Sequence, residues 1–373
     1  MANNNDNKVP NVPHLRFPEF TGEWEKLKLD AFTERVMRKN KNNLSKLPLT
    51  ISAQYGLVDQ ITFFNKVVAS TDMSNYYLLK KGEFAYNKSY SSDYPWGAIK
   101  RLDNYEQGAL SSLYICFAPQ DNVESDFILQ YFESPKWHKG VSEIAVEGAR
   151  NHGLLNISVQ DFFHTYHYIP KDKKEQTKIA KLLMLLDKRI ATQNKIIERL
   201  QSLMSGIVEK TFVSTRYAPL QHYAPIITSG KDKDSGGNYP LYGSTGIIGS
   251  VSKPSYTKTA VLIARVGSIG NVQYVTIPCG ISDNTLIIDA GENNRFIYYY
   301  LNDYNFSHIT SGTTQPLITA SSVKKIAVPI IEKQRKKKII AMMNSIEHKL
   351  CNEKHIASLL SRQKGFLISQ MFI

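Results

Sequence analysis

The sequence predicts an α+β protein in which two globular mixed α/β domains are separated by two long antiparallel coiled-coil helices, with a pseudo-twofold internal repeat. Two observations support this prediction. Two lysine-rich segments, which begin near Ile179 and Ile339, share one apolar pattern at a constant offset of 160 residues, and a long internal repeat of this kind largely decides the fold class. The segments between and before them are instead rich in Tyr, Gly, Ser, Thr and Asn, with short β-type runs.

The apolar residues of both lysine-rich segments are spaced alternately by four and three positions, which is the heptad stripe of a coiled coil. A helix from about 174 to 210 is roughly 50 Å long, too long for an ordinary element of one compact domain. Neither segment can bury its single stripe alone, whereas pairing buries both. The polar interruption also recurs, as Gln193 and Glu353. The predicted seam is Ile179, Leu183, Leu186, Ile190, Gln193, Ile197, Leu200, Met204 and Ile207, repeated as Ile339, Met343, Ile346, Leu350, Glu353, Ala357, Leu360, Lys364 and Leu367.

The other two segments have the short runs and turn residues of globular domains. Each ends with a polar glycine-containing loop, an apolar run and a proline, Pro170 or Pro329, just before a long helix, where proline is tolerated. The expected strands are 76–79, 84–86, 113–117, 260–264, 271–275 and 285–288, and the expected short helices are 125–132 and 295–301. The expected domains are 1–170 with a disordered extreme N-terminus, a central helix 171–213, a second domain 214–329 and a C-terminal helix 330–373.

Composition limits the class of protein. An apolar content of 42% places the chain of 373 residues among soluble globular proteins. No run approaches the roughly 18 apolar residues of a membrane span or resembles a secretory signal, so we expect a cytoplasmic protein. Three cysteines that lie far apart argue against a disulfide framework or a zinc knuckle.

The net charge of +13 indicates an acidic partner, and the excess is concentrated in the predicted helices. Residues 15–169 hold 17 basic and 18 acidic side chains, whereas 170–214 hold 10 and 5, and 329–373 hold 9 and 3. Two functional interpretations stay open: the helices lie close to nucleic-acid phosphates, or their outer faces bind partner proteins. A run of lysines is also typical of a solvated helix face.

Several stretches of the sequence, taken together, indicate a family. They are PHLRFPEFTGEW at 13–24, NKVVAS at 65–70, KGEFAYN at 81–87, EQTKIA at 175–180, YPLYGSTGIIG at 239–249 and VLIARVGSIG at 261–270. From end to end, the chain resembles the specificity (S) subunit of type I restriction–modification systems. The stretches are similar to the N-terminal lead, to two types of target-recognition domain and to the start of the central helix of such subunits. The start of the second helix, EKQRKKKI at 332–339, departs from the family pattern by its extra lysines.

The resemblance implies a non-catalytic DNA-binding subunit that recognises a bipartite asymmetric site, with one half-site for each domain. It also implies that the helix pair docks two modification subunits, and optionally two restriction subunits; the family favours this docking over phosphate contacts by the helices. S-adenosylmethionine, ATP and Mg²⁺ would belong to those partners, with no cofactor in this chain. Because the two domains differ in sequence, the two half-sites should differ as well.

No sequence motif supports catalysis. Asp93-Tyr94-Pro95-Trp96 resembles the Asp/Asn-Pro-Pro-aromatic motif of amino-methyltransferases but has Tyr at the second position, and no GxGxxG loop, phosphate loop or HExxH helix is present. The pair His164 and His167 has no neighbouring Cys or carboxylate cluster and occurs in a strand-like alternating run, which favours packing over a metal site. Three alternatives stay open: a complex that only methylates, a non-enzymatic coiled-coil scaffold and a self-sufficient methyltransferase.

Base readout requires donor and acceptor side chains on loops that reach the major groove. Glycines in such loops allow close approach to phosphate, while Arg265 suits guanine and Gln315 suits adenine. For any one of these residues, a solvated turn or a local cap is the alternative. The candidate DNA-binding residues are Asn87, Lys88, Ser89, Tyr90, Lys100, Arg101, Arg150, Asn151, His152, Ser244, Thr245, Arg265, Ser268, Thr313, Thr314 and Gln315.

Overall fold

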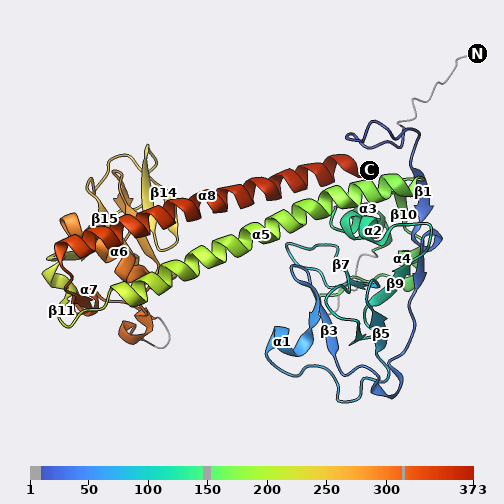
Figure 1. Cartoon of the computed structure of the whole chain (residues 1–373), viewed down its shortest axis with the longest axis horizontal. Coiled ribbons are helices and arrows are strands. Elements are labelled where there is room, and N and C mark those ends of the chain that lie inside the picture. Colours follow the sequence, from blue (N-terminus) through green and yellow to red (C-terminus); the bar gives the residue numbers. More distant parts are fainter. Residues whose placement is uncertain (1–9, 146–152, 313–315) are drawn as a thin grey trace, which may run out of the picture. The chain divides into compact units, whose positions relative to one another are not determined.

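The computed structural model describes residues 10–145, 153–312 and 316–373. It divides into two compact units: unit 1 is Met1–Thr192 with Ala357–Ile373, and unit 2 is Gln193–Ile356. Each unit holds one mixed α/β domain (Figure 1). Two helices of 39 residues each, α5 (Lys173–Thr211) and α8 (Lys333–Met371), contribute residues to both units. The predicted fold class is confirmed.

The domain of unit 1 contains two four-stranded sheets and one two-stranded ribbon. Its strands and helices are β1 (Glu25–Lys28), β2 (Thr33–Arg35), β3 (Pro48–Ser52), β4 (Gly56–Asp59), α1 (Gln60–Phe64), β5 (Tyr77–Lys80), β6 (Phe84–Asn87), β7 (Ala98–Arg101), β8 (Gln107–Leu110), β9 (Ile115–Pro119), α2 (Ser125–Phe132), α3 (His138–Ile144), α4 (Val159–Phe163) and β10 (Tyr166–Ile169). The strand orders are β2-β9-β6-β7, β4-β3-β8-β5 and β1-β10. The pair β3–β8 is parallel, and the other named pairs are antiparallel.

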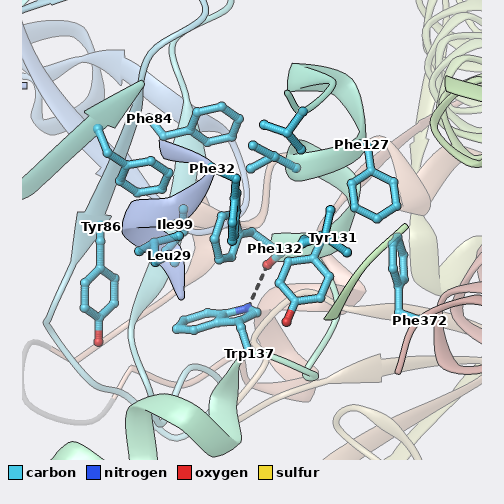
Figure 2. Close-up of a cluster of buried hydrophobic side chains, with 14 of the residues drawn as sticks. Leu29, Phe32, Phe84, Tyr86, Ile99, Phe127, Tyr131, Phe132, Trp137 and Phe372 are labelled. Atoms are coloured by element: carbon cyan, nitrogen blue, oxygen red, sulfur yellow. Dashed lines mark hydrogen bonds between the residues drawn. The ribbon is translucent and has the colours of Figure 1, made fainter. Parts of the chain in front are cut away.

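Aromatic side chains dominate the core of unit 1 (Figure 2). The rings of Phe84 and Phe117, on neighbouring strands, stack with centroids 5.4 Å apart. Phe372, just beyond α8, packs edge-on against Phe127 and Tyr131 of α2, at 5.5 and 5.7 Å. Such aromatic pairs add to the stabilisation from area burial. The end of α8 is therefore part of the core of unit 1.

The segment before β1 packs on the first turn of α5. Arg16 forms a bidentate ion pair with Glu175, with Nε 2.7 Å from Oε1 and Nη2 2.8 Å from Oε2. Trp24 Nε1 also donates to Oε1, at 3.2 Å. Glu175 is 1% exposed, so its charge is removed from water and depends on these donors. Lys178, one turn later, pairs with Glu19 at the surface.

The domain of unit 2 contains a four-stranded sheet, a three-stranded sheet and a two-stranded ribbon. Its strands and helices are β11 (Tyr217–Pro219), β12 (Ile226–Ser229), β13 (Tyr239–Gly243), β14 (Gly246–Val251), β15 (Ala260–Ala264), β16 (Val272–Val275), β17 (Gly280–Ile281), β18 (Thr285–Asp289), α6 (Asn294–Asn302), α7 (Ala320–Lys324) and β19 (Ala327–Pro329). The strand orders are β12-β18-β15-β16, β14-β13-β17 and β11-β19. All residues of β15 are buried, because this central strand has neighbours on both sides.

The two domains share the order and pairing of their principal elements. In each, a ribbon precedes a long helix, and a hairpin pairs in parallel with a later short strand, β3 with β8 and β13 with β17. Helices α2 and α6 follow corresponding strands, and short helices α4 and α7 precede the last ribbon strand. Unit 1 adds α1, β5 and α3. The repeat seen in the sequence of the helices therefore extends to the topology of the domains.

The predicted seam residues of α5 and α8 are all buried or half-buried. In unit 1, Lys364 forms an ion pair with Asp187, and in unit 2 the amide of Gln193 donates to the carboxylate of Glu353. Asp187 precedes Gln193 in α5, whereas its partner Lys364 follows Glu353 in α8, as in an antiparallel pair of helices. The two polar residues that interrupt the stripe contact each other, which satisfies both inside the seam.

Candidate nucleic-acid interface

Arg265 is the first residue after the buried strand β15, and two backbone hydrogen bonds hold its main chain in place. Its N–H donates to the carbonyl of Asn284 at 2.9 Å, and its carbonyl accepts from the N–H of Ile318 at 3.0 Å. Within the described residues, the Arg265 Nε is buried and has no hydrogen-bond partner. Because this Nε is inaccessible to solvent, a contact with the bidentate edge of guanine would have to come from the terminal nitrogens of the half-buried guanidinium.

The tip of the β13–β14 hairpin lies beside the Arg265 loop. Asn271 Nδ2 donates to the carbonyl of Ser244 at 2.7 Å, and Gln273 Nε2 donates to the carbonyl of Gly243 at 2.8 Å. A Cβ at Gly267, whose φ is +70°, would lie 3.2 Å from the Ser244 hydroxyl. Glycine at 267 therefore permits both the left-handed turn and the close approach of the two loops.

These contacts place four of the predicted DNA-binding residues on one surface of unit 2. Ser244 and Arg265 are half-buried, while Thr245 and Ser268 are exposed at the same loops. The segment after 315 also reaches this surface, because Ile318 bonds to Arg265 and Leu317 pairs with Ser311. The predicted residues Thr313, Thr314 and Gln315 themselves lie outside the described residues.

Lys88 occupies the position in unit 1 that Arg265 occupies in unit 2. Both residues follow a central strand, β6 or β15, and both carbonyls accept from the segment that leads into a short helix. The donor in unit 1 is the N–H of Leu155, at 2.9 Å, and the donor in unit 2 is that of Ile318. Sequence comparison by a constant offset misses this equivalence, because the two domains differ in length.

The residues around Lys88 form a compact loop. The side chain of Asn87 accepts from the N–H of Ser89 at 3.0 Å, and the N–H of Tyr90 donates to the carbonyl of Gly153 at 3.0 Å. Ser89 and Tyr90 are exposed. This pairing brings 87–90 next to the segment that follows 150–152, although Arg150, Asn151 and His152 lie outside the described residues.

Lys100 and Arg101 have acidic partners inside unit 1. Lys100 pairs with Glu133 at 2.6 Å, and Arg101 pairs with Asp103 and Asp126, both at 2.7 Å. The side chains of the two basic residues are only 13% and 11% exposed, so their donors face α2 rather than solvent. Their geometry favours the attachment of α2 to β7 over base contacts.

His164 and His167, the pair singled out in the sequence, have separate environments. The structure places His164 at the end of α4, not in the strand-like run expected from the sequence, whereas His167 lies in β10. His167 is buried and bonds to Tyr131 and Thr165, and burial lowers its pKa to about 3. A neutral, packed imidazole agrees with the predicted packing role. Among the described residues, no cluster of His, Cys, Asp or Glu is arranged to hold a metal ion.

The lysine run at the start of α8 is divided between the inside and the outside of unit 2. Lys336 donates to Asn293 at 2.7 Å and lies 5.0 Å from the ring centre of Phe296, and burial lowers its pKa. Lys333, Arg335 and 337–338 are exposed. One lysine therefore attaches α8 to its domain, and the others form a basic surface.

Sequence reasoning missed Asn271 and Gln273, whose amides hold the hairpin tip in place. The run 271–275 was expected as a strand, and alternation along a strand directs these two polar residues to one face. That alternation could have identified them. It could not have shown that the hairpin at 239–251 lies against that face.

The fold and its loops define a class of protein: two domains of one topology, each attached to a long helix, with donor-bearing loops at the end of the central strand. Residues 222–361 match the family model of the type I restriction modification DNA specificity domain. A Haemophilus influenzae protein described as a type I restriction enzyme specificity subunit is 26% identical over 141 residues, which is 35% of this chain. The chain spans 37% of the length of that relative.

Solved structures share the fold over nearly the whole chain. The type I restriction–modification S subunit from M. genitalium has a TM-score of 0.65 at 19% identity, over 97% of this chain and 99% of that one. A chain from a structural study of assembly and conformational transition in the type I R-M system has a TM-score of 0.55 at 14% identity, over 96% and 99%. The resemblance to type I specificity subunits is thereby confirmed: residues 222–361 match the specificity-domain model, and the fold is that of solved S subunits.

The structure also bears on membrane association. Among the described residues, none of the helices has the length and apolar content needed to cross a bilayer. Outside their seam the two long helices carry many charged residues together with exposed apolar side chains such as Leu185, Leu203 and Phe366.

Proposed function

We propose that this chain is the DNA-binding specificity subunit of a type I restriction–modification complex and recognises a bipartite asymmetric site, one half-site with each domain. One observation carries the proposal: unit 1 repeats the topology of the domain that matches the DNA specificity family. A chain with two such domains has two candidate recognition surfaces. Since the loops at these surfaces differ in sequence, the two half-sites differ.

The equivalent positions Lys88 and Arg265 support different half-sites. The planar guanidinium of Arg265 can bond in a bidentate way to O6 and N7 of guanine. The ammonium of Lys88 is a point donor on a flexible stem and selects less sharply. Its Nζ already lies 3.4 Å from the carbonyl of Ile157. We therefore assign a guanine contact to unit 2, and a less stringent contact to this position of unit 1.

The helix pair is the surface that fits the partners. Helices α5 and α8 have equal length, a repeated seam and basic outer residues, so they offer two related surfaces for two copies of one partner. We assign these surfaces to two modification subunits, and optionally to two restriction subunits. S-adenosylmethionine, ATP and Mg²⁺ are then held by the partners, and this chain performs no chemistry.

A methyl-transfer assay with tritiated S-adenosylmethionine tests the proposal. The isolated chain and the isolated modification subunit should each transfer no label to DNA, while their complex should label one bipartite sequence. Transfer by this chain alone would identify a self-sufficient methyltransferase. If the modification subunit alone labels the same sequence, this chain has no role in recognition. If the complex labels DNA without any sequence preference, this chain is a scaffold.

A further inference from the structure

The hairpin tip of unit 2 contains an irregularity that turns two isoleucines outward. Leu241 of β13 pairs with Gly249, but the next residue, Tyr242, pairs with Ile247, so Ile248 is an extra residue in β14. Such a bulge bends the strand and redirects its side chains. Ile247 and Ile248 are consequently 63% and 49% exposed.

The two isoleucines are not equally free. The position that a Cβ at Gly243 would occupy is 2.6 Å from Cδ1 of Ile248 and 2.9 Å from its Cγ2. Ile248 therefore lies directly over the glycine backbone and forms a base for the tip. Ile247 is the more exposed of the two and extends beyond it.

The surroundings of this apolar tip are polar. Ser244 and Thr245 form the hairpin turn, and Ser268 follows Gly267, which adjoins the Ser244 hydroxyl. A stable protein interface needs a broad, well-packed apolar centre, and two isoleucines surrounded by hydroxyls and glycines do not provide one. The combination of hydrogen-bond donors with one small apolar projection corresponds instead to the chemistry of a base-pair edge.

We propose that Ile247, supported by Ile248, packs against the 5-methyl group of a thymine in the half-site of unit 2. Thymine is the base that presents a methyl group in the major groove, beside an O4 acceptor that a hydroxyl can reach. Arg265 on the adjacent loop then contacts a guanine of the same half-site. This inference rests on the proposed function and adds to it a thymine-specific contact.

Unit 1 has a related feature at the corresponding hairpin. The turn between β3 and β4 exposes Tyr55, whose side chain is 69% accessible. Each domain thus exposes apolar side-chain surface at the hairpin whose first strand pairs in parallel with a later strand. The recurrence supports a role for the tip in both domains.

Deoxyuridine, which differs from thymidine by this methyl group, provides the test. The full chain, assembled with its modification subunit, is titrated with DNA duplexes that contain the sequence that the complex methylates. In each duplex a different thymidine of the half-site of unit 2 is replaced by deoxyuridine. One replacement should weaken binding about fourfold, as expected for one buried methyl group. Ile247→Ser should bind the thymine duplex and the deoxyuridine duplex equally. Ile247→Val, which keeps the branched Cβ and both γ-carbons and loses only the δ-methyl group, should retain the preference for thymine.

Ile226 provides a matched control. It is also 63% exposed in unit 2, but it pairs with Asp289, at the end of β18 remote from the Arg265 loop. Ile226→Ser should retain the thymine preference of the wild type. Specific binding that is unchanged by every deoxyuridine replacement overturns this inference alone. An Ile247→Ser variant that no longer binds the modification subunit but still prefers thymine to deoxyuridine also overturns it. A complex with no specific binding overturns the proposed function together with it.

Discussion

Loss of Arg16 should destabilise unit 1 far more than loss of a neighbouring surface ion pair. The side chains of Arg16 and Glu175 are 13% and 2% exposed. Arg16→Met leaves the buried carboxylate with the Trp24 Nε1 donor alone, at 3.2 Å. Removal of one partner from a buried pair costs roughly 3–5 kcal/mol, and the partial exposure of Arg16 places this case near 3 kcal/mol. Arg16→Met combined with Glu175→Gln should recover most of the loss, because no buried charge remains.

Urea unfolding followed by tryptophan fluorescence measures this change in unit 1 specifically. The three tryptophans of the chain, Trp24, Trp96 and Trp137, all belong to unit 1. Lys178→Met is the matched control: Lys178 joins the same N-terminal segment to α5 through Glu19, but both side chains are 46% exposed, so water screens the pair. Equal shifts for Arg16→Met and Lys178→Met, or no recovery in the double variant, would refute the reasoning.

Three further predictions concern the pH dependence, the half-site and the spacing. His167 has a folded pKa of about 3, so the stability that its neutral form contributes is complete above pH 6.5 and is lost as the pH falls towards 3. His167→Gln should therefore reduce the slope of unfolding free energy against pH between pH 6.5 and 5.5, by up to about 1.4 kcal/mol per pH unit. An unchanged slope would contradict this assignment. Arg265→Ala should remove the discrimination at one base position of one half-site, which is about 1–3 kcal/mol. Exchange of 215–328 for the same segment of another specificity subunit should replace that half-site alone. A methylation motif that changes in both halves would disprove modular recognition. Four residues inserted near Gln193 and Asn194 add about 6 Å to α5 and displace its seam. The number of base pairs between the two half-sites should then change, or the complex should fail to assemble. An unaltered number would exclude a spacing role for the helix.

The long helices and several strands could be predicted from the sequence because their signals are local. The heptad stripe fixes the seam of α5 and α8, and the expected helix 125–132 coincides with α2. The apolar runs at 260–264 and 285–288 appear as β15 and β18. In each case the pattern lies within one element, and burial follows directly from it.

The hairpin β13–β14 was not predicted because Gly243, Gly246 and Gly249 interrupt its apolar alternation. Its bulge breaks the regular register within the hairpin, and its parallel pairing with β17 joins residues 39 positions apart, which no local pattern contains.

The candidate site was predicted in part, for the same reason. The choice of Arg265 and Ser244 followed from loops next to strong strand signals, and the structure brings these loops together. Lys100 and Arg101 were chosen as a basic pair, but their acidic partners Glu133 and Asp126 occur 33 and 25 residues later, at the end of α2 and in its first turn. Tertiary pairing of this kind decides whether a basic residue faces solvent, and it is invisible in the local sequence.

Methylome sequencing tests the central claim most directly. A host that expresses this chain with its modification subunit is compared with a host that lacks only this chain. The account predicts a split, asymmetric N6-methyladenine motif that appears only when this chain is present, with both half-sites visible. A stable complex that leaves no such motif, or the same motif in the absence of this chain, would contradict the account.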